Sequence, residues 1–166
     1  STVKNIEDYW NNNFIAFAIG CSFSFEDALL NAGLEIDHIK NNKVVPMYRT
    51  NIKNKKSGPF NSQMVVSMRI FNQKDIEKVR QISANFSFAH GDPIHIGDPI
   101  EIGIKNILSP DWGDSPRIKN EEEEYIFWAC GVTPQNAIIE ARIPFCITHT
   151  PGHMLITDIT EDSLHN

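Results

Sequence analysis

The sequence lacks three features that mark other classes of protein. None of its apolar runs approaches the ~20 residues that cross a bilayer, which predicts that it is not an integral membrane protein. It has only three cysteines and no C-x-x-C spacing, which favours a reducing compartment over a secreted disulfide framework. Its 15 Lys and Arg residues are outnumbered by 21 Asp and Glu, and the net charge of −6 argues against binding to nucleic acid or an anionic membrane.

What is present is typical of one folded domain. The chain has 166 residues, of which 41% are hydrophobic and 22% charged, and it contains no repeats or low-complexity tracts. We therefore expect a single α/β unit over residues 1–166. The first residues show no signal peptide and no initiating Met, so we expect a processed or trimmed chain. The expected location is the cytoplasm, or the mitochondrial matrix for a eukaryotic source.

Two segments share one predicted order of elements, namely strand, Gly/Cys turn, hydroxyl cap and helix. In the first, the apolar run 14–19 predicts a buried strand closed by Gly20, followed by a helix over 25–32. Ser24 is the predicted cap of that helix and Gly33 its stop. Units of this kind place backbone N–H groups and a helix N-terminus at the carboxyl end of a strand.

The second unit lies far downstream. Residues 125–130 read as a strand and Gly131 as part of a tight turn, and the helix over 135–142 begins with Thr133 as its cap. Two short strands are expected after it, at 145–149 and 154–158.

The stretch between the two units predicts a smaller inserted lobe at 44–116 with β-β-α-β order. Its expected elements are strands at 44–51 and 63–70, a helix over 76–82 capped by Asn72, and short strands at 94–96 and 100–104. The overall expectation is an α/β fold with a mixed sheet.

Histidine and aspartate gather in two turn-rich clusters. One holds His90, His95 and Asp98, and the other holds His149 and His153. Imidazole and carboxylate together are the usual acid/base pair near neutral pH, so catalysis is one interpretation. A metal site is a second, because both residue types are frequent ligands, and simple hydrogen bonding to nearby carbonyls is a third.

Cysteine and arginine provide further candidates. Cys21 and Cys130 each sit at a strand-to-helix turn, where a helix dipole can activate a thiol, although a tight turn also favours a small residue. Arg49 and Arg69 could each bind a carboxylate through paired N–H groups or form an ordinary ion pair. Asp111 is first of all a residue that favours turns and only secondarily a candidate acid.

Five ordered blocks of this sequence resemble the hydro-lyase family that includes mitochondrial D-glutamate cyclase. The blocks are residues 19–26 (IGCSFSFE), 45–51 (VPMYRTN), 90–98 (HGDPIHIGD), 128–135 (WACGVTPQ) and 147–154 (ITHTPGHM). The resemblance implies cyclisation of D-glutamate to 5-oxo-D-proline with loss of water and without a cofactor. Members of the family are longer at the N-terminus, so it also implies a fragment or a short member.

The resemblance also directs the choice of site residues. Expected to be catalytic are His95, His149, His153, Asp98 and His90. Expected to bind substrate are Arg49, Cys21, Ser22, Gly131, Thr133 and Gln135. No bound metal is expected, and the expected partner is a small carboxylate or amino acid, with a homo-oligomer possible. Two alternatives stay open: a non-catalytic binder or sensor of small acids, and a metal-dependent hydrolase or lyase that uses the histidines as ligands.

Overall fold

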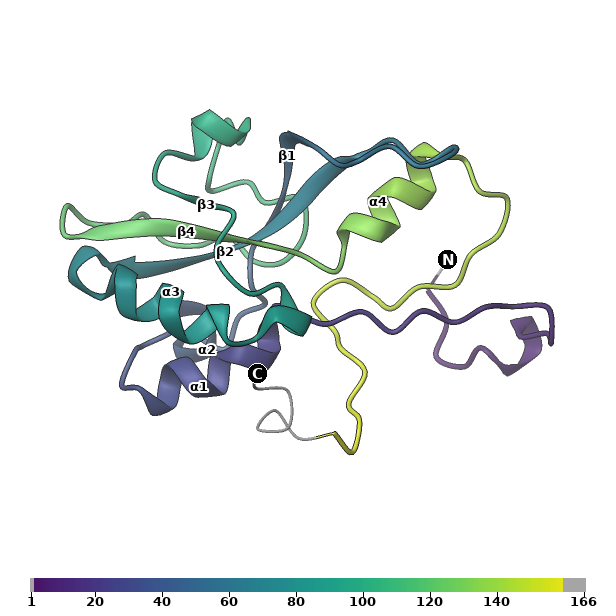
Figure 1. Ribbon diagram of the computed structural model, residues 1–166, viewed down its shortest axis with the longest axis horizontal. Coiled ribbons are helices and arrows are strands. Elements are labelled where there is room, and N and C mark those ends of the chain that lie inside the picture. Colours follow the sequence, from purple (N-terminus) through teal and green to yellow (C-terminus); the bar gives the residue numbers. More distant parts are fainter. Residues whose placement is uncertain (1, 160–166) are drawn as a thin grey trace.

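A four-stranded antiparallel sheet organises the molecule (Figure 1). In this computed structural model, which describes residues 2–159, the strands are β1 (Met47–Lys53), β2 (Gln63–Asn72), β3 (His95–Ile96) and β4 (Glu123–Ala129). They are ordered β1-β2-β4-β3, and every neighbouring pair is antiparallel. The longest pairing joins β2 and β4, from Val66 opposite Ala129 to Asn72 opposite Glu123. With the helices described next, this confirms an α/β fold, although the sheet formed by the described residues is antiparallel and not mixed.

The helices are short and lie mainly to one side of the sheet. The α-helices are α1 (Glu26–Asn31), α2 (Asp37–Lys40), α3 (Ile76–Ala84) and α4 (Thr133–Glu140). The 3-10 helices are η1 (Glu7–Tyr9), η2 (Ser22–Phe25), η3 (Gln73–Asp75), η4 (Ser87–Ala89) and η5 (Pro99–Ile102). Figure 1 shows α1, α2 and α3 together along one side, with α4 near one end. Among the described residues, no helix combines the length and apolarity needed to cross a bilayer.

Alternation along the strands gives the sheet two buried faces. Trp128 of β4 packs with Phe25 and Val79 between the sheet and the helices. Its neighbour Phe127 points to the opposite face and packs with Met68. We call these the Trp128 face and the Phe127 face. Because both faces are covered, β2 and β4 read as nearly continuous apolar runs.

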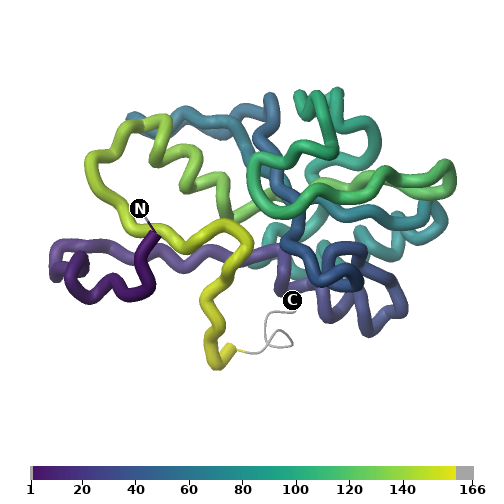
Figure 2. Tube along the Cα trace, turned by 180° about the vertical axis from the view of Figure 1, so that it is seen from behind, coloured from purple at the N-terminus to yellow at the C-terminus, as the bar shows by residue number. Residues whose placement is uncertain are grey.

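Several predicted strands are absent from the described residues. Residues 14–19 form no strand there, and Ile15 and Phe17 are 79% and 82% exposed. Residues 145–149 and 154–158 are likewise irregular. An apolar run reports a preference for burial but not which partner strand will pair with it, so these strand predictions were wrong. Residues 14 and 145 nevertheless meet, because the rings of Phe14 and Phe145 stack at 5.7 Å. The two end segments run side by side there (Figure 2).

The predicted strand at 100–104 is the 3-10 helix η5 instead. Asp98 Oδ1 accepts a hydrogen bond from Ile100 N, and Pro99 occupies the first turn. Cap and proline together favour a helical start over an extended strand.

Helix positions are predicted better than helix caps. The helix at 25–32 is confirmed as α1, and Gly33 ends it with φ +80°. Ser24 is not its cap, because η2 leads directly into α1. Asn72 is a cap, but of η3, which leads into α3: its side chain accepts a bond from Lys74 N, and α3 itself has no side-chain cap. Thr133 is not a cap, and its hydroxyl instead bonds to the backbone of Val65.

Strand β4, which lies outside the stretch at 44–116, pairs with strands inside it. Within that stretch β1, β2, α3 and β3 follow one another in the predicted order. Strand β4, which comes later in the chain, lies between β2 and β3. The two sequence regions therefore share one sheet.

Candidate active site

A buried arginine lies at the centre of a polar cluster on the Trp128 face. The side chain of Arg69 is only 1% exposed. Its Nε donates to Glu26 Oε1 at 2.8 Å, and its Nη2 also bonds to that oxygen. Nη1 donates to Ser67 Oγ at 3.1 Å, and Nη2 donates to Ser22 Oγ at the same distance. All three guanidinium nitrogens are therefore engaged inside the protein.

Glu26 balances this buried charge. Burial alone would raise the pKa of its carboxyl, but the Arg69 cation and a contact with His38 outweigh that effect and lower it. His38 Nε2 lies 3.1 Å from Glu26 Oε1, and both side chains are largely buried. The guanidinium also stacks over the rings of Phe25 and Trp128 at 5.1 and 5.3 Å. The cluster thus ties β2, α1 and α2 together.

The turn at residues 20–22 lies directly against the segment at 88–90. A Cβ placed on Gly20 would lie 1.6 Å from the backbone oxygen of Phe88, so no other residue fits there without a shift. The ring of His90 hydrogen-bonds to the backbone of Gly20. Gly131 also approaches, since a Cβ on it would lie 3.9 Å from the Gly20 oxygen. Three segments that are distant in sequence therefore meet at Gly20.

His90 has an unusual backbone and an unusual ring environment. Its φ of 78° is left-handed, a conformation that is strained for a residue with a side chain. Its Nε2 is buried and has no hydrogen-bond partner among the described residues. With Nδ1 assigned as the donor to Gly20, Nε2 of the neutral ring carries a free lone pair. An orphaned imidazole nitrogen of this kind is a candidate proton acceptor.

The surroundings of His90 keep its ring neutral. Burial is the main cause that lowers the pKa of His90, and the positive charge of Arg69 acts in the same direction. The hydrogen bond to Gly20 opposes them but does not prevail. His90 is therefore an unprotonated base at neutral pH.

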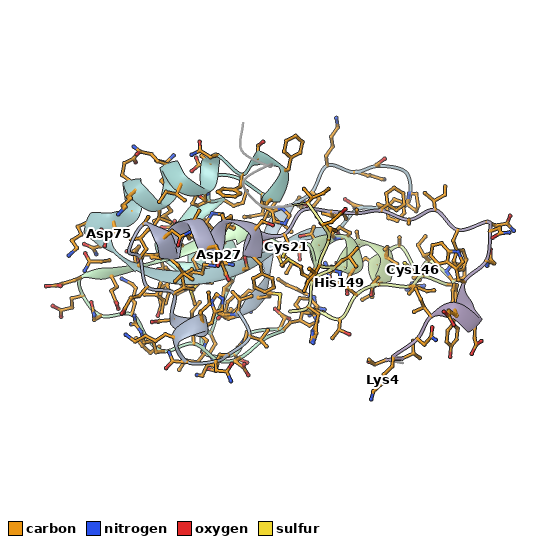
Figure 3. All side chains as sticks on the ribbon, turned by 90° about the horizontal axis from the view of Figure 1, so that it is seen from below. Lys4, Cys21, Asp27, Asp75, Cys146 and His149 are labelled. Atoms are coloured by element: carbon orange, nitrogen blue, oxygen red, sulfur yellow. The ribbon has the colours of Figure 1, made fainter. Side chains whose placement is uncertain are left out.

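The two turn cysteines are protonated thiols. Burial raises the pKa of Cys21 and raises that of Cys130 to about 11. A thiol in this state is a poor nucleophile, so the geometry favours the small-residue interpretation of both positions. The third cysteine, Cys146, is exposed and lies well apart from Cys21 in Figure 3.

Arg49 lies on the same sheet face but is half exposed. Its side chain is 47% exposed, and Nη1 donates to Asp111 Oδ1 at 2.6 Å. Nε donates to Asn136 Oδ1 at 3.1 Å, and the guanidinium stacks 4.4 Å above the ring of Trp112. Its backbone N also donates to Asp111 Oδ2. Arg49 is thus held in one orientation while part of its guanidinium faces solvent.

The remaining predicted residues of the second unit are engaged in structural contacts. Thr133 anchors α4 to Val65, as described above. Gln135 Nε2 lies 3.2 Å from His149 Nε2 and donates to the His149 backbone oxygen at 3.1 Å. Gln135 also lines an open groove of about 350 Å³ between α4 and the following segment. These bonds fasten the C-terminal segment to α4.

His95 and Asp98 are not brought to His90. The ring of His95 lies 5.7 Å from that of Phe127, on the face opposite Arg69. Its Nε2 bonds to the Asp98 backbone oxygen at 2.9 Å, while the Asp98 carboxylate caps η5. His153 lies in an exposed turn, with Nδ1 3.4 Å from the Pro151 oxygen. His95 and the Asp98 carboxylate are therefore held apart from His90.

No metal-binding cluster is found in the part of the chain that the structure describes. No three or more His, Cys, Asp or Glu side chains between residues 2 and 159 are grouped so that they could hold an ion. The candidate centre there consists of His90, two thiols and an arginine–glutamate pair with His38 beside it.

Sequence reasoning did not identify the contacts of either arginine. Arg69 is paired with Glu26 and Ser67, and Glu26 in turn with His38. Arg49 is paired with Asp111, Trp112 and Asn136. One signal was available for the first group. Arg69 and Ser67 alternate within the otherwise apolar run 64–71, which predicts two polar side chains on one buried face. The partners of Arg49 lie 62 and 87 residues away, and no local pattern identifies them.

Comparison with known proteins finds one family model and several relatives that share one designation. A family model described as D-glutamate cyclase matches residues 15–158. A protein of Burkholderia multivorans named "Putative hydro-lyase" is 52% identical over 98% of this chain. Proteins of Pelagibacter ubique and Dinoroseobacter shibae with the same designation are 50% and 51% identical over 96% and 98% of it. The chain spans 62%, 61% and 54% of the lengths of these three relatives.

Proposed function

The chain belongs to the D-glutamate cyclase family, and on that premise we propose that it acts as a hydro-lyase that converts D-glutamate to 5-oxo-D-proline and water. The observation that supports this most directly is His90. Its buried Nε2 has a free lone pair and its ring stays neutral. Cyclisation needs a base of this type, because the α-ammonium group must lose a proton before its nitrogen can attack.

The proton inventory of the reaction is simple. Nε2 of His90 takes one proton from the α-ammonium group, and the resulting amine attacks the γ-carboxyl carbon and forms the C–N bond. The imidazolium returns its proton to a γ-carboxyl oxygen. That oxygen also receives the second proton that nitrogen loses, and it leaves as water when the C–O bond breaks. No oxidant, reductant or nucleotide enters the balance.

Arg49 is the proposed anchor for the substrate's α-carboxylate. It is the half-exposed arginine of the two, and its orientation is set by Asp111, Asn136 and Trp112. A guanidinium held in this way binds a carboxylate without first losing much rotational freedom. Arg69 is unsuited to this role, because it is buried and fully engaged.

The position of His90 makes one demand on substrate binding. Because Nε2 is closed off from solvent, the segment at 88–91 must move for a ligand to reach it. The same enclosure separates the reacting groups from bulk water, which suits a reaction that expels water.

A non-catalytic acid-binding protein is the second candidate. The held guanidinium of Arg49 supports it, since a binder needs a carboxylate clamp but no base. The two proposals differ in what they require of His90.

The decisive experiment measures turnover directly. The purified protein is incubated with D-glutamate and, separately, L-glutamate, with and without EDTA, and 5-oxoproline is followed by chiral chromatography. We expect turnover of the D isomer alone that survives the chelator. His90→Gln should reduce kcat by a factor of ~10² or more, as expected for loss of a general base.

His95→Gln provides the comparison. It removes a histidine from the opposite face, and turnover should stay within a few-fold of the wild type. Binding of D-glutamate without turnover, unchanged by His90→Gln, would instead identify the binding protein. Turnover that depends on His95 and not on His90 would overturn the assignment.

A further inference from the structure

The Arg69–Glu26 pair has no direct part in the proposed chemistry, although it is the most deeply buried charge pair described. Its guanidinium makes four hydrogen bonds to Glu26, Ser22 and Ser67. The side chains of Arg69 and Glu26 are 1% and 8% exposed. A buried pair of this kind is weak evidence for stability, because removing two charges from water costs about as much as their attraction returns. Its presence therefore calls for another explanation.

The contacts of the pair lead to His90 through one short turn. Arg69 Nη2 donates to Ser22 Oγ at 3.1 Å, and Ser22 Oγ lies 3.2 Å from Ser67 Oγ. Two residues earlier, Gly20 receives the hydrogen bond from the His90 ring. Gly20 also packs against the backbone at Phe88 so closely that a Cβ has no room. Arg69 thus holds the turn at Ser22, and His90 contacts the same turn at Gly20.

We propose that Arg69, held in place by Glu26, is a positioning residue of the hydro-lyase site, which fixes the Gly20–Ser22 turn and through it the orientation of the His90 ring. The inference rests on the proposed function in one respect, that His90 is the base. Glu26 holds the guanidinium through two of its nitrogens, so the fork cannot rotate away from Ser22. Burial is the main cause that lowers the pKa of His90, and the positive charge of Arg69 adds to it, so the pair also favours the neutral form of the base.

The test removes the pair without opening a cavity. The double variant E26Q/R69M keeps the side-chain volumes and removes both charges, and such replacements are often neutral for stability. We expect it to fold, as judged by its circular dichroism spectrum and a cooperative thermal transition. Its kcat for D-glutamate should fall at least tenfold with KM little changed. The NMR titration of His90, identified by the signal lost in H90Q, should move to higher pH.

Two further variants separate positioning from mere structure. R69K retains the positive charge but lacks the planar guanidinium that bonds to Glu26 and Ser22 together. Its His90 titration should therefore stay near that of the wild type, while its kcat should lie between those of the wild type and E26Q/R69M. S22A keeps the ion pair and breaks only the link to the turn, and it should lower kcat without raising KM. S22A also decides the question should E26Q/R69M fail to fold.

The matched control removes an exposed pair of the same type. Lys40 and Glu35 form a 2.8 Å ion pair at the surface, outside the 88–91 segment, and K40Q/E35Q should leave both readouts unchanged. A folded E26Q/R69M protein with wild-type kcat and an unmoved His90 titration would overturn the proposal. So would an S22A variant that changes only KM. Because the titration needs no substrate, it tests whether the pair acts on His90 even if the wild type turns out not to cyclise D-glutamate.

Discussion

Two arginines on one face of the sheet differ in exposure, and the roles that we propose for them follow from that difference. Arg69 is enclosed, and all its nitrogens are bonded to protein groups. Arg49 is held by Asp111 and Asn136 but is half exposed. Charge alone does not distinguish them. The number of guanidinium nitrogens left for a ligand does, and on that measure only Arg49 is available to a substrate carboxylate.

Replacing Arg49 should weaken substrate binding more than it slows the chemistry. Hydrogen bonds to a charged group contribute ~1.5–3 kcal/mol, so Arg49→Gln should raise KM for D-glutamate by roughly 10- to 150-fold. Arg49→Lys should restore little, because an ammonium cannot reproduce the planar fork. Initial rates over a range of D-glutamate concentrations measure the effect. A fall in kcat at constant KM would contradict the role assigned to Arg49.

The lowered pKa of His90 links the stability of the protein to pH. The folded-state pKa lies below the ordinary value of 6.5, so below that pH the unfolded chain binds a proton that the folded chain does not. Stability should therefore decrease as pH falls from about 7 toward 5. Urea unfolding of the wild type and H90Q at several pH values tests this. The decrease should be smaller in H90Q, and equal slopes would show that His90 does not contribute.

At the scale of elements, the close approach of two turns sets the geometry of the site. Gly20 has no positive φ, and it is required because the Phe88 carbonyl occupies the space of a Cβ. Local sequence gives no sign of this, since the contact joins residues 68 positions apart. The hydroxyl of Thr133 likewise bonds to Val65 in β2 rather than capping its own helix. Residues that sequence reasoning assigned to local turns thus serve contacts between elements.

Adding a methyl group at Gly20 should therefore be costly. Gly20→Ala forces the 88–90 backbone to shift, and overpacking of this kind destabilises by about 1–3 kcal/mol. Gly131→Ala is the matched control, because its Cβ would meet only ordinary contact at 3.9 Å. Chemical denaturation of both variants measures the difference. Equal stability of the two would show that the turn accommodates a side chain.

At the scale of the whole molecule, the two ends of the described chain expose large apolar side chains. Phe17 near one end and Ile156 near the other are 82% and 86% exposed. The two end segments are in contact through Phe14 and Phe145, and contiguous exposed apolar patches mark sites of association. The sheet and its helices, by contrast, bury their apolar residues on both faces.

We predict that this chain self-associates through these end segments. Sedimentation velocity at micromolar concentration should show species larger than the 18.8 kDa monomer. F17S/I156S should shift the distribution toward monomer, whereas V79S, which removes a core contact, should unfold the protein instead. A wild-type chain that stays monomeric over the whole concentration range would contradict the prediction.

Much of this protein can be read from the sequence, where the signal is local. The strands β1, β2 and β4 and the helices α1, α3 and α4 are all predicted near their observed positions, because periodicity and turn residues report on neighbours along the chain. Family membership is also carried by short local blocks, which the comparisons confirm. His90 was among the predicted site residues for the same reason.

The tertiary structure alone decides which of these residues meet. It places His95, in β3, opposite Phe127, and therefore on the face away from Arg69, although only five positions separate His95 from His90. It brings Glu26 to Arg69 across 43 positions, and it leaves residues 14–19 without a partner strand among the described residues. Local patterns record how each segment prefers to fold. Pairing between distant segments depends on the packing of the whole chain, and the candidate site is assembled at that level.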